Sequence, residues 1–292
     1  MTSSKSNAIG PILLATDLSA RSDRALERAV LIAKQNQTSL VVLHVLESSL
    51  LERLGQPGWP AIESGYQERA NAFLLEDLAH LDVSVEAIVR SGDVVKQVQW
   101  VMREKSCSLV ITAHSHDDSL ARLVLGSNVE RLARECAVPF LIVKKRVHHP
   151  YQHIAVASDF SQGAQHALVN ALTLVPHAKV TIFHAIDPQH DLINANHNIE
   201  KSGKAFIQQV HQTMLSLSRP FEPENLSVVI EQGPPSMQLK HFVEQHKIDL
   251  VVLGTHGLSG ILRTAMGSVA EQMLANLSCD VMIVRQPHQF DV

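Results

Sequence analysis

The chain has 292 residues, of which 45% are hydrophobic and 18% are charged, and its formal net charge is −4 at pH 7. This composition is typical of a folded globular protein, and the length is sufficient for two domains of ordinary size. A slightly acidic chain lacks the basic surface that general nucleic-acid binding requires, so we expect no nucleic-acid partner. The sequence contains no apolar stretch of about 18 residues, the length that a membrane-spanning helix needs, so we expect no membrane span.

The cysteines and the first residues of the chain indicate the cellular compartment of the protein. The three cysteines, Cys107, Cys136 and Cys279, are odd in number and have no metal-binding spacing. Unpaired thiols of this kind fit a reducing compartment. The opening residues MTSSKSNAIG are polar and lack the apolar core of a secretory signal. We therefore expect a cytoplasmic protein.

In the first half, short apolar runs alternate with longer segments in which apolar residues recur at helical spacing. Ser19 is the expected N-cap of the first helix, whose residues Ala25, Ala29, Ile32 and Ala33 form a core-facing stripe. The apolar runs predict strands at residues 12–16, 39–46, 84–91, 109–113 and 140–144. The periodic segments predict helices at residues 20–35, 63–80, 94–105 and 127–136.

An insertion at residues 48–62 separates the second predicted strand from the next helix. Pro57, Gly58 and Pro60 predict irregular structure there. Trp59 is expected to pack this loop onto its own domain; the alternatives are that it covers a pocket or binds a partner.

The second half repeats the same alternation of strands and helices, which predicts parallel sheets with right-handed crossovers. We expect strands at residues 154–158, 179–186, 226–231, 249–253 and 281–285. We expect helices at residues 162–175, 199–218, 237–246 and 268–277.

The two halves are related by an internal repeat with a period of about 141 residues. The segment PILLATDLS at 11–19 matches HIAVASDFS at 153–161, which aligns Asp17 with Asp159. In the same way His44 aligns with His184. We therefore expect two domains of ordinary size, residues 1–146 and residues 151–292, joined by the segment RVHHPYQ at 146–152.

The segment GTHGLSGILRTAMGS, residues 254–268, follows a buried strand and precedes a helix. Glycines such as Gly254, Gly257 and Gly267 accept positive φ and allow a ligand to approach the backbone closely. Free N–H groups and the helix dipole at a helix start favour a bound anion such as phosphate. In an open α/β sheet, ligands bind at this edge. The segment therefore predicts a phosphate site.

The spacing G-x2-G-x9-G-S of this loop resembles the motif of the universal stress protein family, in its ATP-binding branch. The likeness extends over both halves, as in the tandem members of the family. It implies an α/β fold of two Rossmann-like domains, each a five-stranded parallel sheet of order 3-2-1-4-5 with helices on both faces. It also implies that the last strands, residues 140–144 and 281–285, pair to form an intramolecular pseudo-dimer, which would protect two sheet edges. A homodimer of two whole chains is compatible with this arrangement. The sequence does not identify any other protein partner.

The resemblance also implies the contacts of an adenine nucleotide, ATP, with or without Mg²⁺. Asp159 is expected to accept hydrogen bonds from the ribose or the adenine amine, and Ala185 to lie against the adenine. Arg263 is placed to neutralise phosphate charge, although it could equally be solvated. The full set of expected contacts is Ser158, Asp159, Ala185, Gly254, Thr255, His256, Gly257, Arg263, Gly267, Ser268 and Val269.

The first half departs from the motif. Ala113 and His116 stand where the second half has its first two glycines, while Gly126 and Ser127 are kept. Because Ala and His resist positive φ, we expect this half to keep the fold but to bind ATP poorly or not at all. Asp17 would then act only as a helix cap.

The segment HSHDD at 114–118 suggests a weak metal site with His114, His116 and Asp117 as ligands. The plainer interpretation is a polar loop at the edge of the sheet, so we expect no metal site.

The chain lacks the phosphate-binding motif GxxxxGK[ST], the GxGxxG fingerprint and the GxSxG elbow. We therefore expect no dedicated enzyme, and at most slow ATP hydrolysis. The expected role is a stress response or signalling function in which ATP occupancy changes a conformation or a partner interaction. Two alternatives stay open: a scaffold that binds no nucleotide, and a metal-dependent phosphoesterase that uses the HSHDD loop.

Overall fold

The structure is a computed structural model, and it describes residues 9–20, 22–47, 59–114, 127–186, 199–218, 222–254, 273–274 and 276–286. In the first half, the strands are β1 (Ile12–Thr16), β2 (Leu40–Glu47), β3 (Val85–Gly92), β4 (Leu109–Ala113) and β5 (Phe140–Val143). The helices of this half are α1 (Asp23–Gln35), α3 (Trp59–Leu78), α4 (Val94–Glu104) and α5 (Ser127–Glu135).

The second half repeats this order. Its strands are β6 (His153–Ala157), β7 (Lys179–Ile186), β8 (Leu226–Gln232), β9 (Leu250–Gly254) and β10 (Asp280–Val284). Its helices are α6 (Gln162–Leu174), α7 (Ile199–Ser216) and α8 (Pro235–His246), with a short 3-10 turn, η1 (Pro223–Asn225), before β8.

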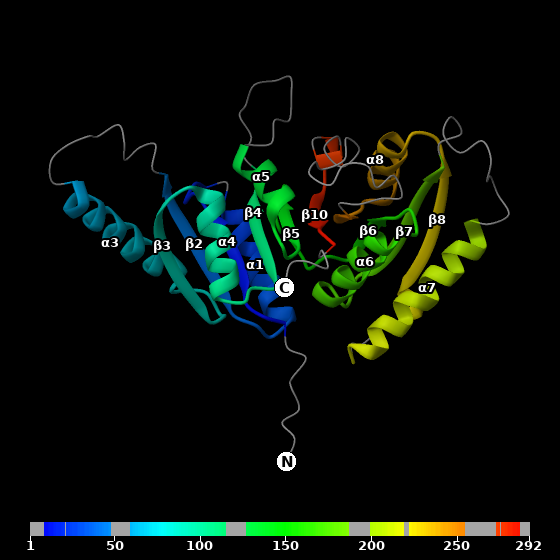
Figure 1. The fold of residues 1–292 in the computed structure, drawn as a ribbon, viewed down its shortest axis with the longest axis horizontal. Helices are drawn as coiled ribbons and strands as arrows, with labels where there is room; N and C mark the ends of the chain where they lie inside the picture. The colour runs from blue at the N-terminus through cyan, green and yellow to red at the C-terminus, as the bar shows by residue number, and fades with distance from the viewer. Residues whose placement is uncertain are drawn as a thin grey trace, which may run out of the picture.

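The ten strands that the described residues form join one sheet in the order β3-β2-β1-β4-β5-β10-β9-β6-β7-β8. Within each half the strands are parallel and follow the predicted order 3-2-1-4-5, so this expectation is confirmed. The halves meet where β5 and β10 pair antiparallel, with Met282 opposite Leu141, in the middle of the molecule (Figure 1). The predicted pairing of the last strands is therefore present within one chain.

Helices cover both faces of this sheet, and two apolar cores result. One core packs α1, α3, α6 and α7 on one face, and the other packs α4, α5, α8 and the residues Met273, Leu274 and Leu277 on the opposite face. Both cores run continuously through the two halves. The predicted stripe on α1, with Ala25, Ala29, Ile32 and Ala33, is buried as expected. In the part of the chain that the structure describes, no helix combines the length and hydropathy that crossing a bilayer requires.

Three expected helix starts are wrong. Ser19 does not cap α1, because that helix begins later and its N-cap position is Ser22. Helix α3 begins at Trp59 rather than at residue 63, so Trp59 and Pro60 belong to a helix and not to an irregular loop. Pro60 is tolerated because the first turn of a helix leaves its N–H groups without intrahelical partners. Helix α8 begins at Pro235 rather than at residue 237, and this proline is tolerated for the same reason.

Candidate functional site

Four of the predicted contact residues come together at the carboxyl edge of the second-half sheet. Ser158 and Asp159 directly follow β6, which pairs with β7 on one side and with β9 on the other. Ala157 lies opposite Phe183 and Leu253, so Ala185 in β7 and Gly254 at the end of β9 reach the same edge. This is the edge at which open α/β sheets bind ligands.

A short loop carries Asp159 from β6 into α6. Phe160 has a left-handed backbone with φ 61°, and its N–H donates to Ser158 Oγ at 3.0 Å. Asp159 Oδ1 accepts from the Ser161 N–H at 3.0 Å. The hydroxyl of Ser161 in turn accepts from the Ala164 N–H at 3.3 Å, which makes Ser161 the N-cap of α6. The loop thus holds the half-buried Asp159 at the start of a helix.

His184 braces this loop from the neighbouring strand. Its Nδ1 lies 2.8 Å from the carbonyl oxygen of Ser158, and because a carbonyl can only accept, Nδ1 donates. The ring also contacts the ring of Phe160, with 4.8 Å between centroids. In the first half, His44 Nδ1 bonds the carbonyl of Thr16 at 2.9 Å in the same way. His184 was missing from the expected site, and its recurrence in both halves was the signal that could have identified it.

Gly254 is required for a different reason from the one expected. Among the described glycines, Gly92 and Gly233 have positive φ, and Gly254 does not. A Cβ added to Gly254 would lie 3.2 Å from the carbonyl oxygen of Gly163, in the first turn of α6. The close approach of β9 to the α6 backbone therefore explains this glycine. Ala113 is the last residue of the equivalent strand β4, so the expectation of a positive φ at this position was wrong in both halves.

The first half builds the same loop with different hydrogen bonds. Leu18 has φ 60°, and its N–H donates to Thr16 Oγ1 at 3.0 Å. Asp17 Oδ1 accepts from the Ser19 N–H, from the Ser19 hydroxyl at 2.7 Å and from the Ser22 hydroxyl at 2.6 Å. Burial raises the pKa of Asp17, but these hydrogen bonds outweigh burial and hold the pKa below its ordinary value. This carboxylate is therefore engaged within its own loop.

The counterparts of the two hydroxyl donors behave differently in the second half. Ser161 stands where the first half has Ser19, and its hydroxyl accepts from the backbone of α6. Ala164 stands where the first half has Ser22, and it has no hydroxyl. Of the two hydroxyl groups at these positions in the first half, only that of Ser19 has a counterpart in the second half, the hydroxyl of Ser161.

The weak metal candidate lies at the first-half edge. His114 is buried beside β4, and its backbone N–H donates to the Val143 carbonyl at 3.0 Å. Among the described residues, no three side chains of His, Cys, Asp or Glu form a group that could hold a metal ion. His116 and Asp117 lie outside the described residues.

The remaining expected contacts, in the glycine-rich loop, also lie outside the described residues. They are Thr255, His256, Gly257, Arg263, Gly267, Ser268 and Val269.

The three cysteines are buried and unpaired. Burial raises the pKa of Cys107 to about 11 and the pKa values of Cys136 and Cys279 to about 12. Since the thiolate is the nucleophile, these residues are inert at neutral pH.

Comparison with known proteins agrees with this architecture. The profile of the Universal stress protein family matches residues 9–144 and again residues 150–285. Universal stress protein E of Photorhabdus laumondii is 20% identical over 296 residues, which cover 94% of each chain. A universal stress protein of Methanocaldococcus jannaschii is 25% identical over 142 residues, or 47% of this chain and 84% of the relative.

A solved structure has the same fold. The crystal structure of a universal stress protein from Archaeoglobus fulgidus superimposes with a TM-score of 0.70 at 20% identity, and the match covers 97% of this chain and 100% of that one. The chain therefore belongs to the universal stress protein family, and it carries the family's sequence twice in tandem.

Proposed function

We propose that the second domain, residues 151–292, binds ATP, and that the first domain, residues 1–146, keeps the fold without this activity. ATP occupancy would change a conformation or a partner interaction during a stress response. The protein would act as a binding protein rather than as a dedicated enzyme, with hydrolysis slow at most. We also propose a cytoplasmic location, which the three unpaired cysteines support.

One observation carries the proposal: the complete glycine motif begins beside Asp159, whereas its counterpart beside Asp17 is incomplete. Gly254 ends β9, which pairs with the strand that Asp159 follows, while Ala113 and His116 stand where the first half would need its first two glycines. A carboxylate that binds a ribose or an adenine amine must accept hydrogen bonds from the ligand. Asp159 suits that role better than Asp17.

The neighbours of Asp159 support the same role. Ser158, Ala185 and Gly254 lie at the same edge of the sheet, and the motif G-x2-G-x9-G-S begins at Gly254. In this proposal the loop residues Gly257, Gly267 and Ser268 would offer N–H groups to the phosphates, and the Ser268 side chain a hydroxyl. Arg263 would neutralise phosphate charge, and Mg²⁺ would enter with the nucleotide.

Calorimetry of ATP and MgCl₂ binding tests the proposal, with Asp159→Ala and Gly257→Ala as loss-of-binding variants. Asp17→Ala is the matched control, because it removes the equivalent carboxylate from the first half. We expect the wild type and Asp17→Ala to bind ATP, and Asp159→Ala and Gly257→Ala to lose ATP binding. Absence of ATP binding by the wild-type chain would overturn the proposal and would favour a scaffold that needs no nucleotide.

A further inference from the structure

A groove of about 600 Å³ lies away from the sheet edge, between α1, the end of α3 and the segment that joins the two halves. This volume falls within the range of small-molecule sites in proteins. The groove is open to solvent on one side. Its walls are formed by Asp23, Leu26, Glu27, Val30, Leu31, Asp77, His80, Leu81, Val147, His148, His149 and Pro150.

The inner surface of the groove is apolar. Leu26, Val30 and Leu31 of α1 face Leu81 and Val147, and all five are only partly buried. Apolar side chains that are half exposed in a concave surface gain free energy when a ligand covers them. The groove therefore favours a ligand with an apolar body.

The charged residues of the groove are all acidic. Asp23 and Glu27 lie one turn apart on α1, Asp77 lies on α3, and all three are exposed. The residues that line the groove include no lysine or arginine, and its other polar side chains are those of His80, His148 and His149. The arginines on the neighbouring stripe of α1 are engaged by backbone carbonyls: Arg24 donates to the Lys144 carbonyl, and Arg28 to the carbonyl of His149 in the groove wall. The groove thus favours a positively charged ligand.

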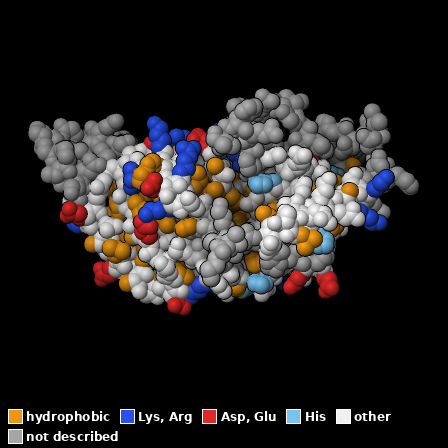
Figure 2. Space-filling model, turned by 60° about the horizontal axis from the view of Figure 1, so that its bottom comes forward, with side chains coloured by type: hydrophobic (Ala, Val, Ile, Leu, Met, Phe, Trp, Pro, Cys, Tyr) orange, Lys and Arg blue, Asp and Glu red, His pale blue; other side chains and the backbone are white. Residues whose placement is uncertain are grey.

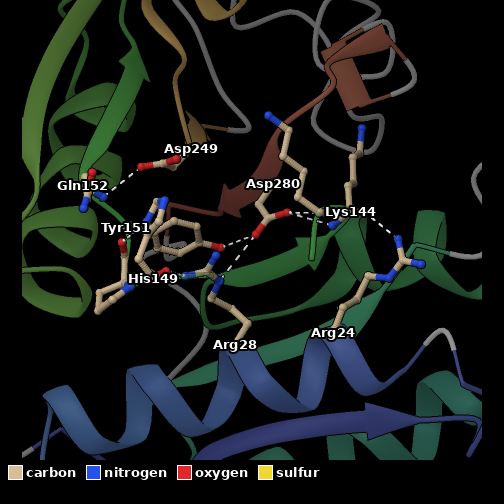
Figure 3. Close-up of polar contacts among 10 residues, drawn as sticks. Arg24, Arg28, Lys144, His149, Tyr151, Gln152, Asp249 and Asp280 are labelled. Carbon is tan, nitrogen blue, oxygen red and sulfur yellow. Dashed lines mark hydrogen bonds and ion pairs between the residues drawn. The ribbon is translucent and has the colours of Figure 1, made fainter. Parts of the chain in front are cut away.

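The wall formed by the joining segment is held in place by a buried polar cluster (Figure 3). Arg28 Nη1 bonds the His149 carbonyl at 3.0 Å, and the guanidinium lies 3.7 Å from the centre of the Tyr151 ring. The Tyr151 hydroxyl donates to Asp280 Oδ2 at 2.6 Å. Asp280 also accepts from the Lys144 N–H at 2.8 Å. The groove wall is therefore preorganised, which lowers the entropy cost of binding.

The composition of the groove selects an organic cation over a metal ion. Among the described residues, the carboxylates and imidazoles of the groove do not form a group of three that could hold a metal. On the first-half side of the molecule, exposed hydrophobic side chains lie among both acidic and basic ones (Figure 2). We propose that the groove binds a small organic cation with an apolar body, of the alkylammonium class.

Three probes of equal length test this proposal: octylammonium, octanol and octanoate, each titrated into the wild-type chain while methyl NMR signals are recorded. We expect octylammonium to shift the methyl signals of Leu26, Val30 and Val147. It should bind about tenfold more tightly than octanoate, and added salt should weaken its binding because the attraction is electrostatic. Equal affinity for the three probes, or shifts confined to other methyl groups, would overturn the proposal.

A double variant, Glu27→Gln with Asp77→Asn, separates the contribution of the groove's negative charge to binding from the contribution of the groove's shape. It retains the size of both side chains and should bind octylammonium about tenfold more weakly, since two of the three carboxylates are lost. Glu104→Gln, on the exposed part of α4 and outside the groove, is the control and should bind like the wild type. If the double variant fails to fold, the methyl shifts of the wild-type chain and the relative affinities of the three probes still test whether the groove binds an organic cation. Unchanged binding by a folded double variant would refute the charge assignment.

Discussion

Ser19 and Ser161 hold the same position in the two halves but use their hydroxyl groups in opposite ways. Ser19 Oγ donates to Asp17 Oδ1 at 2.7 Å, whereas Ser161 Oγ accepts from the Ala164 N–H at 3.3 Å. The first serine ties up a carboxylate, and the second caps a helix. This difference accompanies the loss of the first two motif glycines from the first half.

Replacing the two serines should affect stability unequally. Ser161→Ala removes the N-cap of α6 and should cost about 1 kcal/mol of stability. Ser19→Ala leaves Asp17 with its bonds from the Ser19 N–H and the Ser22 hydroxyl, so the cost should be smaller. Urea unfolding of both variants measures the difference. Equal losses would show that the two hydroxyl groups do not have distinct roles.

A methyl group at Gly254 should be destabilising although the backbone there is ordinary. The Cβ of Gly254→Ala would lie 3.2 Å from the Gly163 carbonyl oxygen, which is part of a helix and cannot move aside alone. We expect a loss of about 1–3 kcal/mol, typical of overpacking. The reverse change in the first half, Ala113→Gly, should cost no more than about 1 kcal/mol. Thermal unfolding compares the two, and a neutral Gly254→Ala would disprove the packing explanation.

Lys144 should make stability depend on pH in the alkaline range. Burial lowers its pKa to about 8, while nearby Cys279 and Asp280 oppose the shift. Between pH 8 and its ordinary pKa of 10.5, the unfolded chain retains a proton that the folded chain has released. Stability should therefore rise with pH across this window, by at most about 3.5 kcal/mol at about 1.4 kcal/mol per pKa unit.

Lys144→Met provides the reference for that measurement, because other groups titrate in the same range. The difference in unfolding free energy between the wild type and Lys144→Met should shift in favour of the wild type as pH rises above 8. A difference that stays constant with pH would contradict the assignment.

Breaking the buried ion pair at the junction of the halves should be costly. Asp280→Ala removes the carboxylate that lies 3.6 Å from Arg28 Nε, and both side chains are almost fully buried. A buried charge left without its partner costs about 3–5 kcal/mol. Asp82→Asn is the control, because it breaks an exposed pair with Lys34 and should cost less than about 1 kcal/mol. Similar losses in urea unfolding would contradict this account.

Most of the strands and helices could be predicted because they follow from local patterns and from the repeat, whereas the strand order followed from the resemblance to the universal stress protein family. The apolar run of β4 and the helical stripe of α1 are readable from neighbouring residues alone. The pairing of β5 with β10 followed from the resemblance to a family in which last strands pair.

Other features depend on residues far apart in the sequence, and the sequence could not reveal them. Tyr151 and Asp280 are 129 positions apart, and nothing local marks them as partners. Gly254 suited a loop motif, but its reason is the approach of Gly163 from another element. The start of α1 was misplaced because Ser19 has the chemistry of an N-cap, but its hydroxyl is donated to Asp17 instead.

The most direct test of the central claim is the number of ATP sites per chain, measured by calorimetry with MgCl₂ in the wild type, Asp17→Ala and Asp159→Ala. The account predicts one site in the wild type, one in Asp17→Ala and none in Asp159→Ala. Two sites in the wild type, or a site that survives Asp159→Ala and is lost in Asp17→Ala, would contradict the assignment of ATP binding to the second half.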